Sequence, residues 1–482
     1  MRWRITVDER FADKFDAQLV TFTLMNLLIR LDEFFPTTEL ILPATRRDAQ
    51  LRLLDADDFA TAMRDFCSPF HAAPRLTIAE GLGTVEPTQQ TLISPRADPR
   101  ALTVWGDGWQ AYLNSTTGDA AGRNPIGPCV AAAFAAAELF KRMIDGIPLR
   151  PGVRVIAVDR LVFGAFDYLL EVGTKPRLGD SIDVGGVVLV GAGGIASATV
   201  FAASSLPALT GDIAIVDDDE LDSTNLNRHM IARPGDRGLK VDLCKAALQF
   251  DPAVRAVPER IEAFFAREGE HHKLVVAAVD DDEVRRRVQA TLPRVLLNAA
   301  TGNRADMRVT RHDFLHDACL ACIARAGLEG DQTTENLARR LGLPYADLLA
   351  LVREQNAVPR ELLQRSTVLS RADLDRFAGL TPDAIWQLIY NEAPLALAEE
   401  EAPSIGFLSA LPGFLLLGEI IKEQTGGDAR PPLNDKFNYL SLSVLGRPLT
   451  DLLRDRRQKR TDCDCGKPAW QRAYARKWSQ AR

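Results

Sequence analysis

The sequence predicts an α/β protein with more than one domain. Short apolar runs of the length of buried parallel strands alternate with segments of helical character along much of the chain. One run, Val187–Val190, leads directly into a glycine-rich turn and a helix of small residues, which is the pattern of a Rossmann-like unit. Because 482 residues exceed what one hydrophobic core organises, we expect two or three domains.

The composition excludes several classes of protein. With 46% hydrophobic and 26% charged residues, it is that of an ordinary soluble globular protein. The net charge of −7 argues against nucleic acid as a partner. The longest apolar stretch, residues 19–31, contains Asn26 and Arg30 and is too short to cross a bilayer. The N-terminus has no signal peptide, so we expect a cytoplasmic protein without a membrane partner.

Residues 1–180 are expected to form an α/β domain without a clear phosphate loop. The pattern predicts helices over 15–35 and 129–144, and strands over 39–42, 76–79 and 102–105. We interpret this region as a degenerate Rossmann-like domain with a structural or partner-binding role. We assign no catalytic residue to it.

Residues 181–325 are expected to form the nucleotide domain. The pattern predicts strands over 187–190, 212–216, 273–279 and 294–299, and helices over 194–206 and 239–250. Acidic residues follow the second and third strands, and the carboxyl ends of parallel strands meet at the edge of a sheet where ligands bind. A ligand site is therefore expected at this edge.

The rest of the chain divides into a helical insertion and a C-terminal part. Residues 326–402 are expected to form several short helices, interrupted by Pro344, Pro359 and Pro382. Residues 403–482 are expected to complete the nucleotide domain with a buried helix over 405–421, a strand over 437–444 and a basic tail.

Three glycines form the candidate phosphate loop: Gly191, Gly193 and Gly194. Glycines between a strand and a helix let the backbone approach a phosphate, and the N–H groups of the first helical turn point at the anion. The motif alone suits a dinucleotide as well as ATP, so a nicotinamide-dependent dehydrogenase is one alternative.

Polar residues further along favour ATP. Asp217 ends the second strand, where a carboxylate can accept ribose hydroxyls. Asn225, Arg228 and Lys240 can hold and neutralise a triphosphate. Asp280, at the end of the third strand, can hold Mg²⁺, which prefers oxygen ligands.

This set of residues resembles the adenylation domain of the ThiF/MoeB/E1 superfamily over about residues 185–325 and 403–466. The resemblance implies activation of the C-terminal glycine of a ubiquitin-like protein as an acyl-adenylate, with release of pyrophosphate. It implies that Asp217 binds the ribose, that Asn225, Arg228 and Lys240 contact the phosphates, and that Asp280 positions Mg²⁺. One departure is His229, where the family often has glutamine.

Four cysteines form two pairs far apart in the sequence: Cys319 with Cys322, and Cys463 with Cys465. Four thiolates can hold a structural Zn²⁺ tetrahedrally. The family often closes its fold with two C-x-x-C pairs, and here the second pair is C-x-C. The alternative is four unrelated buried thiols.

A cysteine that would receive the activated glycine as a thioester is missing from the expected place. The insertion contains none, which leaves Cys67, Cys129 and Cys244. Three explanations stay open. The adenylate passes directly to an acceptor, one of the three cysteines serves from an unusual position, or the natural cysteine is replaced in this sequence, with residues 402–404 as a place to look.

Two adenylation-type folds in one chain would form a pseudo-dimer, as in E1 enzymes. The resemblance therefore implies a ubiquitin-like partner and an E2-like partner that docks on residues 326–400. The Ala- and Arg-rich composition is typical of a bacterial protein. Together with the family resemblance, it implies the E1-like, BilD-type component of bacterial ubiquitin-like conjugation operons used in antiphage defence. The alternatives are a ThiF/MoeB-type sulfur-carrier adenylyltransferase and a nucleotide-binding scaffold without turnover.

Overall fold

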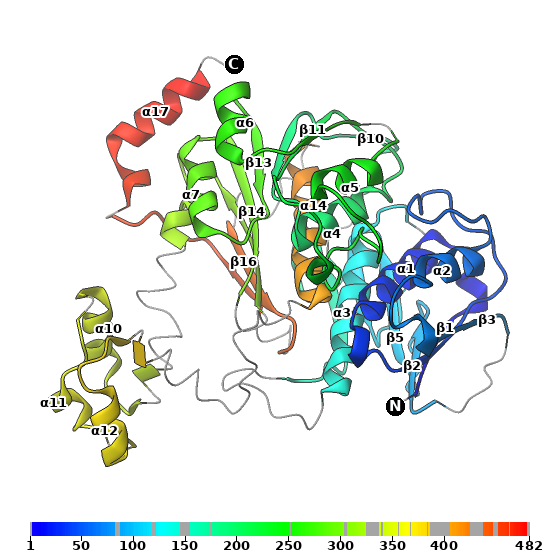
Figure 1. Ribbon diagram of the computed structural model, residues 1–482, viewed down its shortest axis with the longest axis horizontal. Coiled ribbons are helices and arrows are strands. Elements are labelled where there is room, and N and C mark those ends of the chain that lie inside the picture. Colours follow the sequence, from blue (N-terminus) through cyan, green and yellow to red (C-terminus); the bar gives the residue numbers. More distant parts are fainter. Residues whose placement is uncertain are drawn as a thin grey trace.

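Two large sheets and a separate helical body make up the computed structural model (Figure 1). It describes residues 2–81, 87–117, 122–144, 155–173, 176–250, 252–302, 306–323, 337–338, 341–354, 356–366, 368–382, 384–385, 405–424, 437–446, 452–461 and 463–479. Among these, no helix is long and apolar enough to cross a membrane.

The N-terminal domain is built on a seven-stranded sheet with the order β3-β2-β1-β4-β5-β6-β7. Strands β1 to β5 pair in parallel, and β6 and β7 continue the sheet antiparallel. The strands are β1 (Arg2–Val7), β2 (Thr37–Ile41), β3 (Leu76–Ala79), β4 (Gln89–Ile93), β5 (Leu102–Asp107), β6 (Gln110–Leu113) and β7 (Leu161–Gly164). The helices are α1 (Phe15–Ile29), α2 (Phe59–Cys67) and α3 (Ile126–Met143).

The nucleotide domain is built on an eight-stranded sheet with the order β12-β11-β9-β13-β14-β15-β16-β17. Its strands are β9 (Val187–Val190), β11 (Asp212–Val216), β12 (Ala253–Val257), β13 (Leu274–Ala277), β14 (Val295–Thr301), β15 (Asp306–His312), β16 (Tyr439–Ser443) and β17 (Leu453–Asp455). Its helices are α4 (Gly194–Ala203), α5 (Lys240–Ala247), α6 (Ile261–Glu268), α7 (Asp282–Ala290), α14 (Gly406–Gln424) and α17 (Pro468–Ser479). The short strands β8 (Ile182–Asp183) and β10 (Leu209–Thr210) pair separately.

Both sheets have the same topology. In each, the first strand lies in the middle, the next two strands extend the sheet on one side, and the fourth and fifth extend it on the other. The turn after β9 carries three glycines, whereas residues 8–14, which follow β1, contain none. The predicted pair of Rossmann-like domains, one of them degenerate, is confirmed by this repeat.

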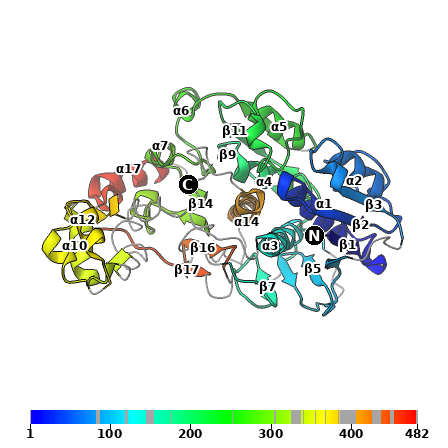
Figure 2. The same cartoon turned by 60° about the horizontal axis from the view of Figure 1, so that its bottom comes forward.

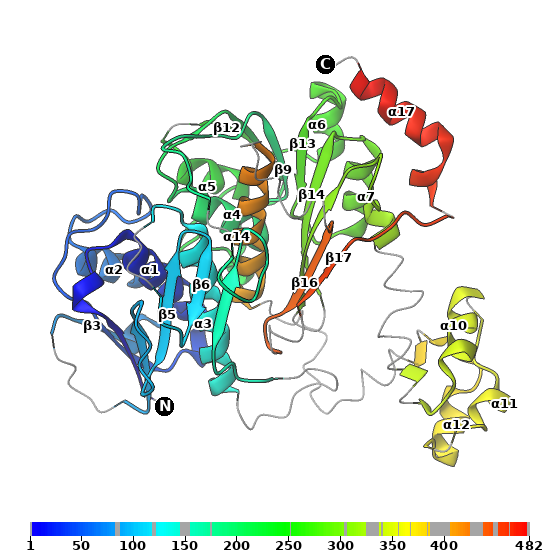
Figure 3. The ribbon, with the colours of Figure 1, turned by 180° about the vertical axis from the view of Figure 1, so that it is seen from behind.

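Helix α14 joins the two domains. It contacts α4, β14 and β15 of the nucleotide domain and also α3 of the N-terminal domain (Figures 2 and 3). A side chain at Gly413 would lie 2.4 Å from the carbonyl oxygen of Ile195, so α14 and α4 cross with almost no space between them. Side chains of both domains form one continuous hydrophobic core. The N-terminal domain is therefore an integral part of the molecule.

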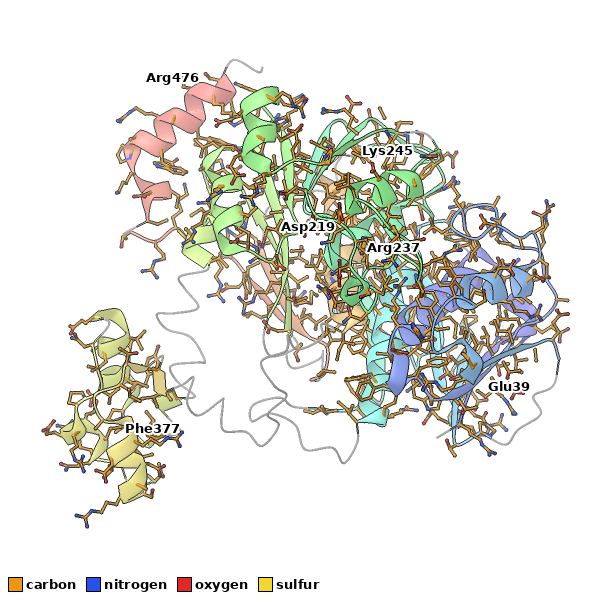
Figure 4. The ribbon with its side chains drawn as sticks, viewed as in Figure 1. Glu39, Asp219, Arg237, Lys245, Phe377 and Arg476 are labelled. Carbon is orange, nitrogen blue, oxygen red and sulfur yellow. The ribbon has the colours of Figure 1, made fainter. Side chains whose placement is uncertain are left out.

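The insertion has a hydrophobic core of its own, which includes Leu348, Leu363 and Phe377. Its described helices are α10 (Tyr345–Glu354), α11 (Arg360–Leu363) and α12 (Arg371–Phe377), and Phe377 marks this body in Figure 4. Helical structure at this place agrees with the prediction.

Some predicted elements differ from the observed ones. The helix predicted over 15–35 ends at Ile29, and a short 3₁₀ helix follows over Asp32–Phe34, where Asp32 has φ +44°. The segment described only as a basic tail contains α17. The domain boundaries at 180, 325 and 402 stay predictions.

Candidate active site

The predicted site residues lie at one edge of the nucleotide sheet. Strands β11, β9 and β13 are parallel neighbours, and Val190 pairs with Val216 on one side and with Ala277 on the other. The loop after β9, Asp217 after β11 and Asp280 after β13 therefore leave the sheet side by side. This edge is also the switch point of the fold, where the chain turns to opposite sides of β9 and ligands bind in open α/β sheets.

The three glycines of the phosphate loop have different structural roles. Gly191 has φ +94°, and a Cβ there would lie 2.8 Å from the carbonyl oxygen of Ala278. At Gly194 a Cβ would lie 3.0 Å from Cβ of Ser409 on α14 and 3.3 Å from Cγ of Arg228. Gly193 has φ −79°, and a Cβ there would meet no described atom within 4 Å. Gly193 thus faces open space at the N-terminus of α4, as a phosphate cradle requires.

The side chain of Asp217 is hydrogen-bonded directly to the phosphate loop. Its carboxylate accepts the N–H of Ala192 at 2.6 Å and the N–H of Asp219 at 2.8 Å. Burial raises the pKa of Asp217, although both backbone N–H groups oppose the shift. Since each carboxylate oxygen has two lone pairs, Asp217 can still accept a ribose hydroxyl.

Arg228 lies against the N-terminal end of α4. Its Nη1 donates to the carbonyl oxygen of Thr224 at 3.0 Å and to Oδ1 of Asn227 at 3.1 Å. The preceding 3₁₀ helix, Ser223–Asn225, is fixed by a capping box in which Asn225 Oδ1 accepts the N–H of Asp222 at 3.1 Å. The structure thus places Arg228 beside the phosphate loop. The side chain of Asn225, which was expected to contact a phosphate, is engaged in the capping box of the 3₁₀ helix.

Lys240 begins α5 and is buried. Its Nζ lies 2.7 Å from Oδ2 of Asp219, whose side chain is exposed. An exposed carboxylate costs little to separate from its partner, so Lys240 can exchange Asp219 for a phosphate. Asp280 is exposed three residues beyond the carboxyl end of β13, where its carboxylate is accessible to a Mg²⁺ ion.

His229 is a site residue that the sequence marked only as a departure from the family. It is buried; Nε2 lies 3.1 Å from the carbonyl oxygen of Ala192, and Nδ1 accepts the N–H of Ala232 at 3.2 Å. Burial lowers its pKa to about 3, so the ring is neutral and Nε2–H donates to the loop. His229 thereby anchors the phosphate loop. Its position directly after Arg228 was the feature of the sequence that could have identified it as a site residue.

The four predicted metal ligands come together across the fold. Cys319 Sγ lies 3.7 Å from Cys322 Sγ and 3.5 Å from Cys463 Sγ, and Cys322 Sγ lies 3.4 Å from Cys465 Sγ. All four thiols are buried, and their sulfur atoms lie within 4.8 Å of one another. Zinc–sulfur bonds of ~2.3 Å place tetrahedral ligands about 3.8 Å apart. These residues therefore fit a structural Zn²⁺.

Backbone groups around the four sulfurs support the same assignment. The N–H of Cys322 donates to Sγ of Cys319 at 3.4 Å, and the N–H of Arg460 donates to Sγ of Cys322 at 3.5 Å. Such donors stabilise the thiolate form that binds metal.

The other three cysteines do not have the environment of a nucleophile. Cys67, Cys129 and Cys244 are buried, and burial raises the pKa of each thiol to about 12. A thiol must be deprotonated and accessible to react. None of the three is placed to accept an acyl group in this structure.

Comparison with known proteins agrees with this geometry. The model of the ThiF family matches residues 177–465, which is more than half of the chain. The chain belongs to the ThiF family. This membership places it among ATP-dependent adenylating enzymes, which use ATP and Mg²⁺.

Individual relatives of this ThiF-family chain are distant. An uncharacterized protein, y4jF of Sinorhizobium fredii (strain NBRC 101917 / NGR234), is 26% identical over 402 residues, which cover 78% of this chain and 75% of that protein. The crystal structure of E. coli MccB with MccA-N7isoASN has a TM-score of 0.36 and 15% identity, covering 59% of this chain and 67% of that one. E. coli MccB with ATP has a TM-score of 0.35 and 16% identity, with the same coverage of both chains.

Proposed function

We propose that this enzyme uses ATP to adenylate the C-terminal glycine of a ubiquitin-like protein and passes the activated acyl group to an acceptor protein. The observation that carries the proposal is the arrangement of Gly193, Asp217, Arg228 and Lys240 around the N-terminus of α4. It offers a phosphate cradle and a ribose acceptor, which a dinucleotide would also use, together with two cations, which suit the greater charge of a triphosphate.

In this reaction a carboxylate oxygen of the substrate attacks the α-phosphorus of ATP. The new bond joins that oxygen to phosphorus, the bond from phosphorus to the pyrophosphate oxygen breaks, and pyrophosphate leaves with its negative charge. Arg228, Lys240 and the N–H groups of α4 stabilise the charge on the phosphates, so the site acts by positioning and electrostatics. Mg²⁺ would neutralise further phosphate charge when bound, and Asp280 is the carboxylate at hand to hold it.

The buried cysteines favour direct transfer from the adenylate. All seven cysteines of the chain lie in its described part and are buried, so an enzyme thioester has no accessible thiol on which to form. The acceptor nucleophile must then come from another molecule. We propose an E2-like protein that docks on the insertion, in the setting of a BilD-type antiphage operon. The same observation favours a second candidate, a sulfur-carrier adenylyltransferase of ThiF/MoeB type, in which the acceptor is a sulfur donor.

The test of adenylation is pyrophosphate–ATP exchange with Mg²⁺ and a candidate ubiquitin-like protein that ends in glycine. Arg228→Ala should slow exchange by about 100-fold, the usual effect of removing one donor to a developing charge. Arg100→Ala, which removes an exposed arginine of the N-terminal domain, is the matched control. Full exchange by Arg228→Ala, or by Asp280→Ala, would contradict the assignment.

The same assay separates the alternatives. ATP binding without exchange against any candidate protein would favour a scaffold. If exchange occurs, the acceptor decides between the two adenylating functions. Transfer of the acyl group to a thiol of an E2-like protein favours the conjugation pathway, and formation of a C-terminal thiocarboxylate favours the sulfur carrier.

A further inference from the structure

Arg228 sits in a strap, residues 226–232, that is bonded on one side to the phosphate loop and α4. Nε2 of His229 donates to the carbonyl oxygen of Ala192, and the N–H of Met230 donates to Oγ of Ser197 at 3.1 Å. The position of Arg228 therefore depends on how firmly this strap is held.

The other side of the strap is held by the N-terminal domain. Arg30, which follows α1, donates from Nη1 to the carbonyl oxygen of Leu226 at 2.7 Å. Its Nη2 donates to the carbonyl oxygens of Met230 at 3.2 Å and Ala232 at 2.9 Å. Asn26 accepts from Nε of Arg30 at 2.8 Å and itself donates to the carbonyl oxygen of Met230 at 2.9 Å.

The guanidinium of Arg30 is an unusual group to bury. The residue is 4% exposed, and among the described residues it forms no ion pair; its partners are carbonyl oxygens, the Asn26 amide and the ring of Phe70 at 5.0 Å. Burial lowers the pKa of Arg30 to about 9, which still leaves it charged at pH 7. The charge of Asp236 favours the charged form of Arg30 without pairing with it, and the charge of Arg233 opposes it. A buried cation without a paired carboxylate costs stability, so a purely structural strap would be better served by a neutral donor.

The charge also lies close behind the phosphate loop. After burial, the positive charge of Arg30 is the largest contribution that lowers the pKa of His229, and His229 is bonded to Ala192 in that loop. A fixed cation in a layer of low dielectric attracts a polyanion in front of it more strongly than a solvated one does.

We propose that Arg30 is a positioning residue through which the N-terminal domain prepares the nucleotide site for ATP. It orients the strap so that Arg228 faces the triphosphate, and it adds a fixed positive charge behind the loop. The proposal rests on the proposed function, since it assumes that ATP occupies the loop. It gives the domain without a phosphate loop a defined part in catalysis.

The chain offers a matched control at the opposite end of α4. Arg52, also from the N-terminal domain, donates to the carbonyl oxygens of Ser204, Leu206 and Pro207 at 2.6–2.8 Å and lies 4.1 Å from the ring of Phe250. Arg30 and Arg52 thus make the same kind of contact across the same interface. They differ in that Arg52 lies at the C-terminal end of α4, a helix of 10 residues that spans about 15 Å.

The experiment compares Arg30→Met and Arg52→Met in the full-length enzyme. A fluorescent ATP analogue measures the Kd, pyrophosphate–ATP exchange gives KM and kcat, and thermal unfolding gives the Tm. We expect Arg30→Met to raise the Kd and KM for ATP at least tenfold, and Arg52→Met to lower the Tm with an ATP Kd within twofold of wild type. Arg30→Lys, which keeps the charge but not the fork of donors, should fall between wild type and Arg30→Met.

A double-mutant cycle tests whether Arg30 acts through Arg228. On the Arg228→Ala background, Arg30→Met should weaken ATP binding much less than it does in the wild type. Equal ATP constants for Arg30→Met and Arg52→Met would overturn the inference and leave the proposed function standing, whereas a wild-type enzyme that binds no ATP would overturn both. If Arg30→Met does not fold, Asn26→Ala replaces it, because this milder change removes one bond to the same strap, and an unchanged ATP Kd would then count against the inference.

Discussion

At the residue scale, the glycines of the phosphate loop serve two different purposes: one is required by the fold, and another leaves room for the ligand. Gly191 is required by the fold, because a side chain there would combine a left-handed backbone with a contact of 2.8 Å to Ala278. The fold does not require a glycine at position 193, because the φ of −79° suits any residue and the space around Gly193 is open. A glycine that the fold does not require points to a ligand that needs close approach to the backbone.

Two substitutions test this difference. Gly191→Ala should destabilise the protein by about 2–4 kcal/mol, through strain at positive φ and the clash with Ala278. Gly193→Ala should change the free energy of unfolding by less than about 0.5 kcal/mol, as surface substitutions do, while the added methyl group raises the Kd for ATP. Denaturant unfolding and ATP titration measure the two effects, and a Gly193→Ala enzyme with unchanged ATP affinity would mean that the phosphates lie elsewhere.

The neutral ring of His229 makes the site sensitive to acid. In the unfolded chain this histidine takes up a proton near pH 6.5, whereas the folded protein holds its pKa at about 3. The unfolded state therefore binds more protons between these values, and the stability that is present above pH 6.5 is lost as the pH falls through this window. At pH 5 the loss amounts to about 2 kcal/mol. His312 is buried, with its pKa lowered to about 4, and acts in the same direction.

Replacement of the ring should remove this effect. In His229→Gln the amide can accept from Ala232 and donate to Ala192 without a titratable group. Between pH 7.5 and pH 5, we expect its free energy of unfolding to fall by about 2 kcal/mol less than that of the wild type. His71→Gln, at an exposed position, is the control. A variant with the same acid sensitivity as wild type would show that His229 is protonated in the folded protein.

At the scale of elements, the strands and helices predicted most accurately from the sequence are those in which almost every residue is apolar and buried. Strands β9 and β11 were predicted to the residue because every position, apart from the first of β11, is apolar and buried. Strand β1 was missed although polar Arg2, Arg4 and Thr6 alternate with apolar Trp3, Ile5 and Val7, which is the pattern of a half-buried strand. Helix α1 was predicted too long because apolar residues continue past Ile29, although the backbone turns at Asp32.

The residues of the candidate site also differ in whether the sequence could reveal them. The glycines, Asp217 and Lys240 could be found because each stands next to a strand or helix end, and Arg228 because the run of residues around it resembles the family. The cysteine pairs could be found because thiols at such spacing have few other uses in a chain of this kind. The role of Arg30 could not be predicted from the sequence, because 196 residues separate it from Leu226 and no local pattern connects the two. Contacts between domains depend on packing that a single sequence does not display.

The C-terminal helix depends on the four-cysteine cluster. Helix α17 follows Cys465 closely, and it lies on the nucleotide domain through Tyr474 Oη, which donates to the carbonyl oxygen of Arg294 at 2.7 Å, and Trp478 Nε1, which donates to that of Leu292 at 3.0 Å. Tyr474 is buried in the hydrophobic cluster that also contains the four cysteines, and Trp478 packs partly buried against it. A metal bound by both cysteine pairs would fix the start of α17 to the domain.

Removal of the metal should release this helix first. The purified protein is expected to hold one zinc per chain by elemental analysis. In Cys465→Ser, limited proteolysis should cut within residues 463–479 while the rest of the chain stays resistant, because the tail loses its attachment. Ser479→Ala, a change at the end of the same helix that leaves the four sulfurs in place, is the control and should keep the tail protected. A wild-type protein without bound metal and with a protected tail would refute the assignment.

At the scale of the whole molecule, two copies of one topology are joined by one continuous hydrophobic core, and only the second copy carries a glycine-rich phosphate loop. The N-terminal copy contributes the buried contacts of Arg30 and Arg52, and α14 packs between the two copies. This arrangement leaves all seven cysteines buried, either in the cores or in the four-cysteine cluster. The enzyme therefore has the parts for activation of a carboxylate, while each of its thiols, all of them in the described part of the chain, lies below the surface.

The burial of every thiol leads to a prediction for the complete reaction. With ATP, Mg²⁺ and its protein substrate, the enzyme should form a substrate adenylate that hydroxylamine intercepts, and no covalent enzyme–substrate adduct sensitive to reductant should appear on gels. The native enzyme should also react with a thiol reagent such as DTNB far more slowly than the unfolded chain, since burial both hides the thiols and raises the pKa of Cys67, Cys129 and Cys244. Ser substitution of each of these three cysteines should leave pyrophosphate exchange intact. A reductant-sensitive adduct that one of these substitutions abolishes would instead show that the enzyme opens to expose that cysteine during turnover, and it would identify the chain as a thioester-forming E1.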